Sequence, residues 1–396
     1  MAKRRFVVHL GLPHTGAGGL AAVLAAHAGP LAEAGVRVPA RSADEARRAA
    51  LELRRLHGTY GLKRKEVEGT LALLCKRARK EGAKTHDPVV VSDDLLAGAT
   101  REQVALLLDS LAGFEVHLVA TLADPARQLV AAWSEAVRAG SDLELRRYAR
   151  RVLDPARRLD EAGAFWADQD VEQVLERWSS ELRRPDRVHV VVPQPGEDPV
   201  LATWRCVARV VGADPGALPV DTHASAVTLD PAGLSGPAGA TGAAGALGSS
   251  LGSSLGSLEV LRGVNASVDG RADGRIRRQL VDAHLAPTSD ALPPAPADLH
   301  EELLDLGERW RKALADGGYD VVGDTTPLLP SPAPVRAVVE PTTEERLATT
   351  TDALGDLLVE LARTREHVED LLKRNAKLER KRASLRTRLA AALVED

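Results

Sequence analysis

Short aliphatic runs alternate along the chain with longer stretches of helical periodicity. Four of these runs are rich in Val and Leu and are bounded by polar or turn residues, which predicts buried strands. The predicted strands lie at residues 6–11, 88–91, 115–120 and 188–192. Helical segments such as 20–28 separate them, and strands that alternate with helices pair in parallel with helices on both faces. We therefore expect an α/β fold whose chemistry lies at the carboxyl ends of the strands, just after Leu10, Val91 and Ala120.

A heptad pattern runs through the last segment, 345–396. Its a positions are Leu354, Leu361, Val368, Asn375, Arg382 and Leu389, and its d positions are Leu357, Thr364, Leu371, Leu378, Leu385 and Ala392. An Asn at a central a position is typical of a two-stranded parallel coiled coil, because two facing Asn side chains pair in that register. Thr364 and Arg382 weaken the seam. The pattern predicts a dimer, homomeric or heteromeric, and the alternative is an amphipathic helix that packs on its own domain.

Two segments of biased composition divide the chain. Residues 231–257 consist almost wholly of Gly, Ala, Ser and Leu, with Gly at every third position over part of the segment. A collagen triple helix needs many more triplets and far more Pro, so we interpret this segment as a flexible linker. A Pro-rich linker is expected at 331–344. The predicted organisation is an α/β domain over 1–330 that the first linker interrupts, followed by the second linker and the C-terminal helix.

Composition narrows the function classes. The chain has 396 residues, of which only 3% are aromatic. Its net charge is -4, so the chain as a whole is not attracted electrostatically to nucleic acid or to an anionic membrane surface. Cys75 and Cys206 form no disulfide framework or metal motif, which suits a reducing cytoplasm. No run of about 18 apolar residues predicts a membrane span. The scarce Trp residues are expected to anchor the core, and they are Trp133, Trp166, Trp178 and Trp204.

The segment Gly11-Leu-Pro-His-Thr-Gly16-Ala-Gly18 follows a predicted strand and opens a helix. Backbone N–H groups in that context hold phosphate, and the segment satisfies the Gly-x-x-x-x-Gly half of a nucleotide-binding P-loop. The Lys and Ser/Thr that should follow, to neutralise phosphate and hold Mg²⁺, are replaced by Ala17 and Gly18. The loop therefore predicts a P-loop-like fold but disfavours a kinase or an ATPase.

Several motifs in order resemble a family. The opening 9–16 with 31–39 behind it, the strand end Val91-Ser-Asp-Asp94, and the segment 121–133 resemble sulfotransferases that use 3′-phosphoadenosine 5′-phosphosulfate, in particular a bacterial, actinobacterial-type branch. Further segments agree in order, namely 165–166, Trp178, 188–196, 258–265 and 318–324. The resemblance covers roughly residues 5 to 330. It implies a three-layer fold with a central parallel sheet and the transfer of a sulfuryl group to a hydroxyl or amine.

The resemblance also implies which positions hold the donor. In the family the loop backbone binds the 5′-phosphosulfate, a loop Lys stabilises the leaving oxygen, and an Arg and a Ser eight residues apart clamp the 3′-phosphate. The corresponding donor-binding positions here are Pro13, His14, Thr15, Gly16, Ala17, Gly18, Ala123 and Ala131, with Arg127 as a substitute cation. A carboxylate at the second strand end, Asp93 or Asp94, matches the base that deprotonates the acceptor.

This chain departs from the family at most of those positions. His14 stands in place of the loop Lys, and Ala123 and Ala131 stand in place of the clamping Arg and Ser. Each lost charge-assisted contact is worth roughly 1.5–3 kcal/mol, so we favour a catalytically degenerate protein over an active enzyme. Two functions compete. One is an enzyme that sulfates a small molecule or glycan, and the other is a binding or scaffold protein that keeps the fold.

The remaining polar candidates have plainer interpretations. His9 and His117 lie inside predicted strands and are expected to be hydrogen-bonded structural residues. The alternative for His14 is an exposed loop residue without a role. The basic cluster 146–151 is interpreted as a solvated helix face, although an anionic acceptor would also fit it. No His and Cys residues stand at metal-ligand spacing, so no metal is expected.

Overall fold

A computed structural model of the chain describes residues 3–218, 254–268, 293–331 and 342–395. It contains one sheet of five parallel strands in the order β2-β1-β3-β4-β5. The strands are β1 (Arg5–Gly11), β2 (Val89–Ser92), β3 (Glu115–Thr121), β4 (Val188–Val191) and β5 (Asp320–Val322). The α/β fold, its parallel sheet and the four predicted strands are confirmed, and β5 is an additional strand at the edge beside β4.

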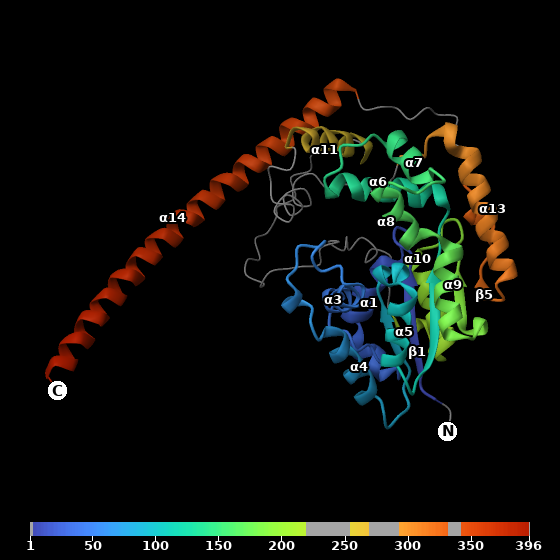
Figure 1. Cartoon of the computed structure of the whole chain (residues 1–396), viewed down its shortest axis with the longest axis horizontal. Coiled ribbons are helices and arrows are strands. Elements are labelled where there is room, and N and C mark those ends of the chain that lie inside the picture. The colour runs from blue at the N-terminus through green and yellow to red at the C-terminus, as the bar shows by residue number, and fades with distance from the viewer. Residues whose placement is uncertain (1–2, 219–253, 269–292, 332–341, 396) are drawn as a thin grey trace.

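Helices cover both faces of the sheet, so the domain has three layers (Figure 1). Alternate residues of the strands, among them Val7 and Val119, pack with one group of helices. That group is α1 (Leu20–Ala26), α2 (Ala28–Glu33) and α10 (Pro199–Val211). The opposite residues, among them Val8 and Leu118, belong to a larger core on the other face. Its helices are α3 (Ala43–Arg54), α4 (Thr70–Lys80), α5 (Arg101–Ser110), α6 (Pro125–Ala139), α7 (Leu145–Leu153), α8 (Asp160–Gln169), α9 (Val171–Leu182) and α13 (His300–Asp316).

Tryptophans anchor this aliphatic core. The four predicted core tryptophans are at most 7% exposed, and Trp310 on α13 is buried with them. Trp133 Nε1 donates to Leu143 O (2.8 Å) and Trp204 Nε1 donates to Pro215 O (2.7 Å), whereas Nε1 of Trp178 and of Trp310 has no hydrogen-bond partner among the described residues. The interpretation of these residues as packing anchors is confirmed.

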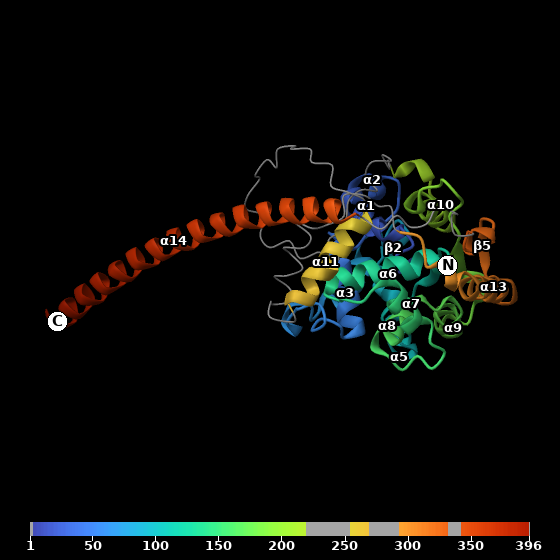
Figure 2. The same cartoon turned by 90° about the horizontal axis from the view of Figure 1, so that it is seen from above.

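Two helices join the domain to the end of the chain. Helix α11 (Ser254–Val268) packs against α6, where Asn265 Nδ2 donates to Val137 O (2.7 Å) and Ser141 O (2.8 Å). Helix α14 (Thr343–Glu395) contacts α11 near its own beginning, where Ala353 is buried, and then runs away from the domain (Figures 1 and 2). The helix expected at 345–396 is therefore present.

The expected linkers fall mostly outside the described residues. Of the segment 231–257, the structure describes only 254–257, and these residues are helical because α11 begins at Ser254. Of the segment 331–344, it describes residue 331 and residues 342–344, and α14 begins at Thr343. The helix expected at 20–28 ends at Ala26, and α2 follows directly. None of the helices in the described part of the chain combines the length and apolar character that a membrane span requires.

Candidate functional site

The loop after β1 is shaped by two residues with positive φ. His14 has φ 71° and Gly16 has φ 88°, and a 3-10 turn at Ala17–Gly19 then leads into α1. A Cβ atom on Gly16 would lie 2.9 Å from Pro199 Cγ, so only glycine fits both the backbone conformation and the close approach of α10. The Gly pattern of the loop thus has a local packing cause.

A cavity of about 210 Å³ lies at the carboxyl ends of β1, β3 and β4. It is lined by Thr15 from the loop after β1, by 122–124 and Arg127 after β3, by 192–197 and Pro199 after β4, and by Pro327. The structure therefore brings Thr15, Ala123 and Arg127 together at one cavity. Pro13, His14, Gly16, Ala17, Gly18 and Ala131 do not line this cavity.

More acidic than basic residues line this cavity. Arg127 is the one cationic residue among those that line it, and Asp124 and Glu197 also line it. Asp124 caps α6, since its Oδ1 accepts a hydrogen bond from Arg127 N (2.9 Å), and burial raises its pKa. Glu197 Oε2 accepts from Gln194 N (3.2 Å) and forms an ion pair with Arg205 through Oε1.

Thr15 carries the buried hydroxyl of this cavity, and that hydroxyl lacks a partner among the described residues. The residue is 2% exposed, and the atom without a hydrogen-bond partner is its Oγ1. The backbone N–H of Thr15 donates to Leu12 O (3.3 Å) inside the loop. The hydroxyl is thus the group through which this wall of the cavity could bind a small polar ligand.

Both carboxylates at the end of β2 are paired with one arginine from α3. Arg47 Nη2 lies 2.7 Å from Asp94 Oδ1, and Arg47 Nε lies 3.1 Å from Asp93 Oδ2. Asp93 is 3% exposed, and its Oδ1 also accepts from Leu95 N (2.9 Å). Burial raises the pKa of Asp93 to about 7, against the effect of Arg47 and with the help of the neighbouring Asp94 charge. Sequence reasoning found the two carboxylates but missed Arg47.

A second ion pair extends this cluster. Arg54, also on α3, lies 3.0 Å from Asp168 Oδ1 of α8 and donates from Nη1 to Leu95 O (3.0 Å). Burial raises the pKa of Asp168. The ion-paired cluster therefore consists of two arginines, Arg47 and Arg54, and three aspartates, Asp93, Asp94 and Asp168. Both arginines are already paired with carboxylates, so neither is free to bind an added anion.

His14 supplies no cation near neutral pH. Burial lowers the pKa of its half-buried ring to about 4, and the Asp94 charge opposes this only in part. Asp94 stands close to the loop, because a Cβ atom on Gly18 would lie 3.5 Å from Asp94 Oδ2. A neutral ring and a carboxylate thus occupy the region where the resemblance places a lysine.

The strand histidines are hydrogen-bonded within the sheet. His9 is hydrogen-bonded at Nδ1 to Ser92 Oγ (2.8 Å) and at Nε2 to Thr121 Oγ1 (3.1 Å), and burial lowers its pKa to about 3. His117 is hydrogen-bonded at Nδ1 to His189 Nε2 (3.0 Å), near the amino ends of β3 and β4 and away from the cavity. The prediction that both are hydrogen-bonded strand residues is confirmed.

The basic cluster on α7 faces solvent and is partly paired. Arg146 and Arg150 lie 3.3 and 3.1 Å from Asp298 Oδ2, and Arg151 lies 2.8 Å from Glu161 Oε1. This agrees with a solvated helix face. Among the described residues, no group of three or more His, Cys, Asp or Glu side chains is arranged to hold a metal ion.

No family model, no curated protein and no solved structure matches this chain. The resemblance to sulfotransferases therefore stays a prediction that rests on its motifs.

Proposed function

We propose that this chain is a cytoplasmic protein with the P-loop-like fold of a sulfotransferase, that it no longer holds the sulfuryl donor, and that it acts as a binding or scaffold protein. The observation that carries this proposal is the charge of the cavity at the carboxyl ends of the strands. Arg127 is the one cationic residue among those described that line it, and two acidic residues, Asp124 and Glu197, line it as well.

The residues present do not fit 3′-phosphoadenosine 5′-phosphosulfate. That donor carries several negative charges, and charge-assisted hydrogen bonds from cations are what hold such groups in proteins. His14 is neutral near pH 7, Arg47 is occupied by two carboxylates, and Ala123 lines the cavity with a methyl group. We therefore derive no transfer step for this chain.

The competing function is an enzyme that sulfates a small molecule or glycan with Asp93 or Asp94 as its base. One observation favours it, because a pKa near 7 suits a general base at neutral pH. Two observations stand against it: Asp93 is 3% exposed, and its two oxygens are taken by Leu95 N and Arg47. An acceptor hydroxyl would have to displace this ion pair before it could reach the carboxylate.

Support for a scaffold comes from α14. Large apolar side chains follow one another along its outer part, and Leu361 and Leu371 are 49% and 48% exposed. A single helix gains little stability in water from an exposed apolar stripe, whereas pairing buries it. We propose that residues 345–396 pair two chains as a coiled coil, so that two domains act as one unit.

Calorimetry with adenosine 3′,5′-bisphosphate tests the donor site. We expect no heat of binding at millimolar ligand, and binding at micromolar strength would contradict the proposal and favour the enzyme. The double variant His14→Lys/Ala123→Arg restores the two cations that the resemblance places here. Binding by this variant would support the assignment of these positions, and its absence would show that the positions are matched wrongly.

Analytical ultracentrifugation of the full chain tests the scaffold. A sedimenting mass of twice 42.1 kDa is expected. A chain that stays monomeric at tens of micromolar would remove the pairing of α14 from the proposal, whatever the calorimetry shows.

A further inference from the structure

The outer part of α14 presents a long unpaired apolar surface. Nine of its large apolar side chains are between 48% and 64% exposed, and they are Leu354, Leu358, Val359, Leu361, Val368, Leu371, Leu372, Leu378 and Leu385. Near Ala353 the helix rests on α11, and beyond that point it extends away from the domain (Figure 2). Within the described residues nothing covers this apolar surface, so burying it requires a contact from outside the described part of the chain.

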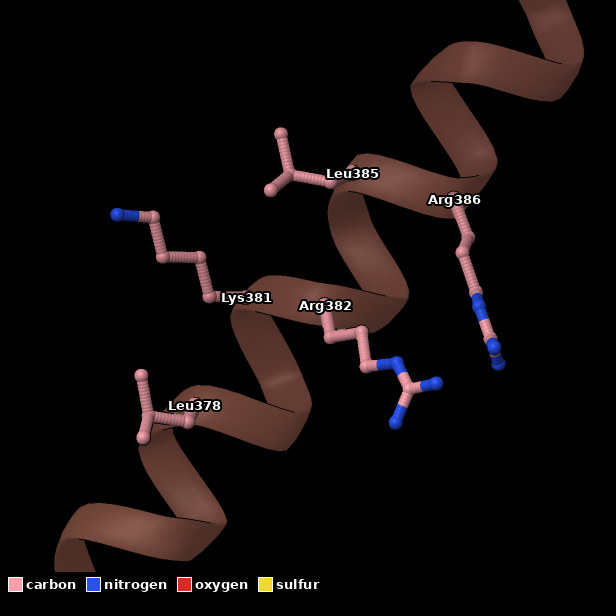
Figure 3. A pocket seen from close by; sticks show the side chains of 5 residues that line it. All are labelled: Leu378, Lys381, Arg382, Leu385 and Arg386. Atoms are coloured by element: carbon pink, nitrogen blue, oxygen red, sulfur yellow. The ribbon is translucent and has the colours of Figure 1, made fainter. Parts of the chain in front are cut away.

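One part of this surface is shaped like the socket of a coiled coil. Leu378, Lys381, Arg382 and Leu385 stand at i, i+3, i+4 and i+7, and with Arg386 they line an open cleft of about 320 Å³ (Figure 3). In coiled coils a side chain of the facing helix inserts between four residues at this spacing. The three cations of the cleft decide which side chain can enter.

Charge is divided between two halves of the free helix. Residues 356–370 carry five acidic and two basic side chains, whereas residues 373–386 carry seven basic and one acidic side chain. A parallel pair in register would lay the basic half of one helix along the basic half of the other. An antiparallel pair would lay each basic half along an acidic half, which is the complementary arrangement.

We infer that a second copy of this chain binds along α14 in the antiparallel direction, with Arg382 facing the partner's Thr364. In this register Leu361 faces the partner's Leu385, and Val368 faces the partner's Leu378. The two polar residues that weaken the seam thus meet each other. The hydroxyl of Thr364 enters the cationic socket, where a parallel pair would place a second Arg382.

One flanking pair agrees with this register. Arg365 stands beside the partner's Glu379, so opposite charges meet next to the seam. The length of α14 also agrees with this register. Residue 395 of one copy faces residue 351 of the other, so the pair ends where α11 begins to cover α14.

Asn375 is the seam residue that favours the parallel direction, because two facing amides can pair. The antiparallel direction gives up this one polar pair. It removes in exchange the contact between two Arg382 side chains and the repulsion along two basic halves. This charge balance replaces the parallel pair expected from the heptad pattern alone.

The direction fixes where the domains stand. An antiparallel pair carries its two domains at opposite ends of the rod, with the Ala353 positions roughly 60 Å apart at 1.5 Å rise per residue. A parallel pair would hold both domains at the same end. The inference rests on the proposed dimerisation and adds its direction and register.

Single-cysteine variants of the full chain test the direction. Leu361→Cys and Leu385→Cys are prepared separately and also co-expressed, then oxidised and run on non-reducing gels. The natural cysteines, Cys75 and Cys206, are both buried, which limits their part in crosslinking. In the antiparallel register only the co-expressed pair forms a crosslinked dimer, because equal positions lie about 36 Å apart at 1.5 Å per residue.

Each outcome has one meaning. If either variant alone forms the crosslinked dimer, the helices are parallel and the inference is wrong. If the full chain sediments as a dimer but no variant or mixture crosslinks, the register is wrong. If the full chain sediments as a monomer, the proposed dimerisation itself has failed, which the ultracentrifuge shows before any cysteine is introduced.

Discussion

The Nη2 atom of Arg47 lies 2.7 Å from the Oδ1 atom of Asp94. The same guanidinium also pairs with Asp93, so one cation is shared by both carboxylates at the end of β2. The resemblance to sulfotransferases would require a free base at this strand end. Here the carboxylates of Asp93 and Asp94 are ion-paired with Arg47. Neither the guanidinium nor the carboxylates are therefore free to act on a ligand at the candidate site.

Removing Arg47 is expected to destabilise the fold. Arg47→Met leaves Asp93 buried without its cation, and breaking a buried pair in this way costs about 3 kcal/mol. Urea unfolding at pH 8 measures the loss. Arg48→Met is the matched control, because Arg48 follows on the same helix and pairs with Asp44 at a half-exposed position, with 29% and 28% of the side chains exposed. An exposed pair contributes at most about 1 kcal/mol, so equal losses in the two variants would contradict the role of Arg47.

The raised pKa of Asp93 predicts a pH dependence of stability. This pKa is about 7 in the folded chain and about 3.9 in an unfolded one. Because the folded state binds the proton more tightly, the contribution of Asp93 is complete below pH 4 and is lost as the pH rises through 7. Asp93→Asn removes this titration. We expect the stability of the variant relative to the parent to rise by roughly 1.4 kcal/mol per pH unit between pH 5 and 7, measured by urea unfolding. Parallel stability curves would show that Asp93 is ionised throughout.

Arg47 and Arg48 illustrate which part of the candidate site could not be predicted from the sequence. The Val-rich runs of β1 to β4 and the heptads of α14 are local patterns, and they predicted the corresponding elements. β5 has three residues, Asp320–Val322, which is too short for such a pattern. Arg47 and Arg48 are identical neighbours in sequence, and only the packing of α3 against the end of β2 turns one toward the carboxylates. The carboxylates themselves were found because they directly follow a predicted strand.

Gly98 is expected to tolerate no side chain. A Cβ atom there would overlap Asp168 Oδ1 and Arg54 Nη2, so Gly98→Ala must separate this ion pair. We expect a loss of about 3 kcal/mol, since the carboxylate is then left without its partner. Gly163→Ala is the control: its Cβ meets nothing within 4 Å inside α8, and alanine should stabilise that helix by about 0.5–1 kcal/mol. Thermal unfolding of the two variants should shift in opposite directions, and a common direction would contradict the contact at Gly98.

Two neighbouring apolar residues on α14 have the same exposure but differ in whether they lie in the proposed seam, so substituting each tests whether the seam is the dimer contact. Leu361 occupies a seam position and is 49% exposed, whereas Val359 lies outside the seam and is 50% exposed. Leu361→Glu places a charge at two seam positions of a dimer, and the lost burial should weaken association by at least roughly 100-fold. Val359→Glu adds the same charge two residues away and should leave the dimer intact. Sedimentation equilibrium of the full-length variants measures both dissociation constants, with circular dichroism to confirm equal helix content. Equal weakening by the two variants would mean that the heptad seam is not the contact surface, because only that surface distinguishes two residues of the same exposure on the same turn.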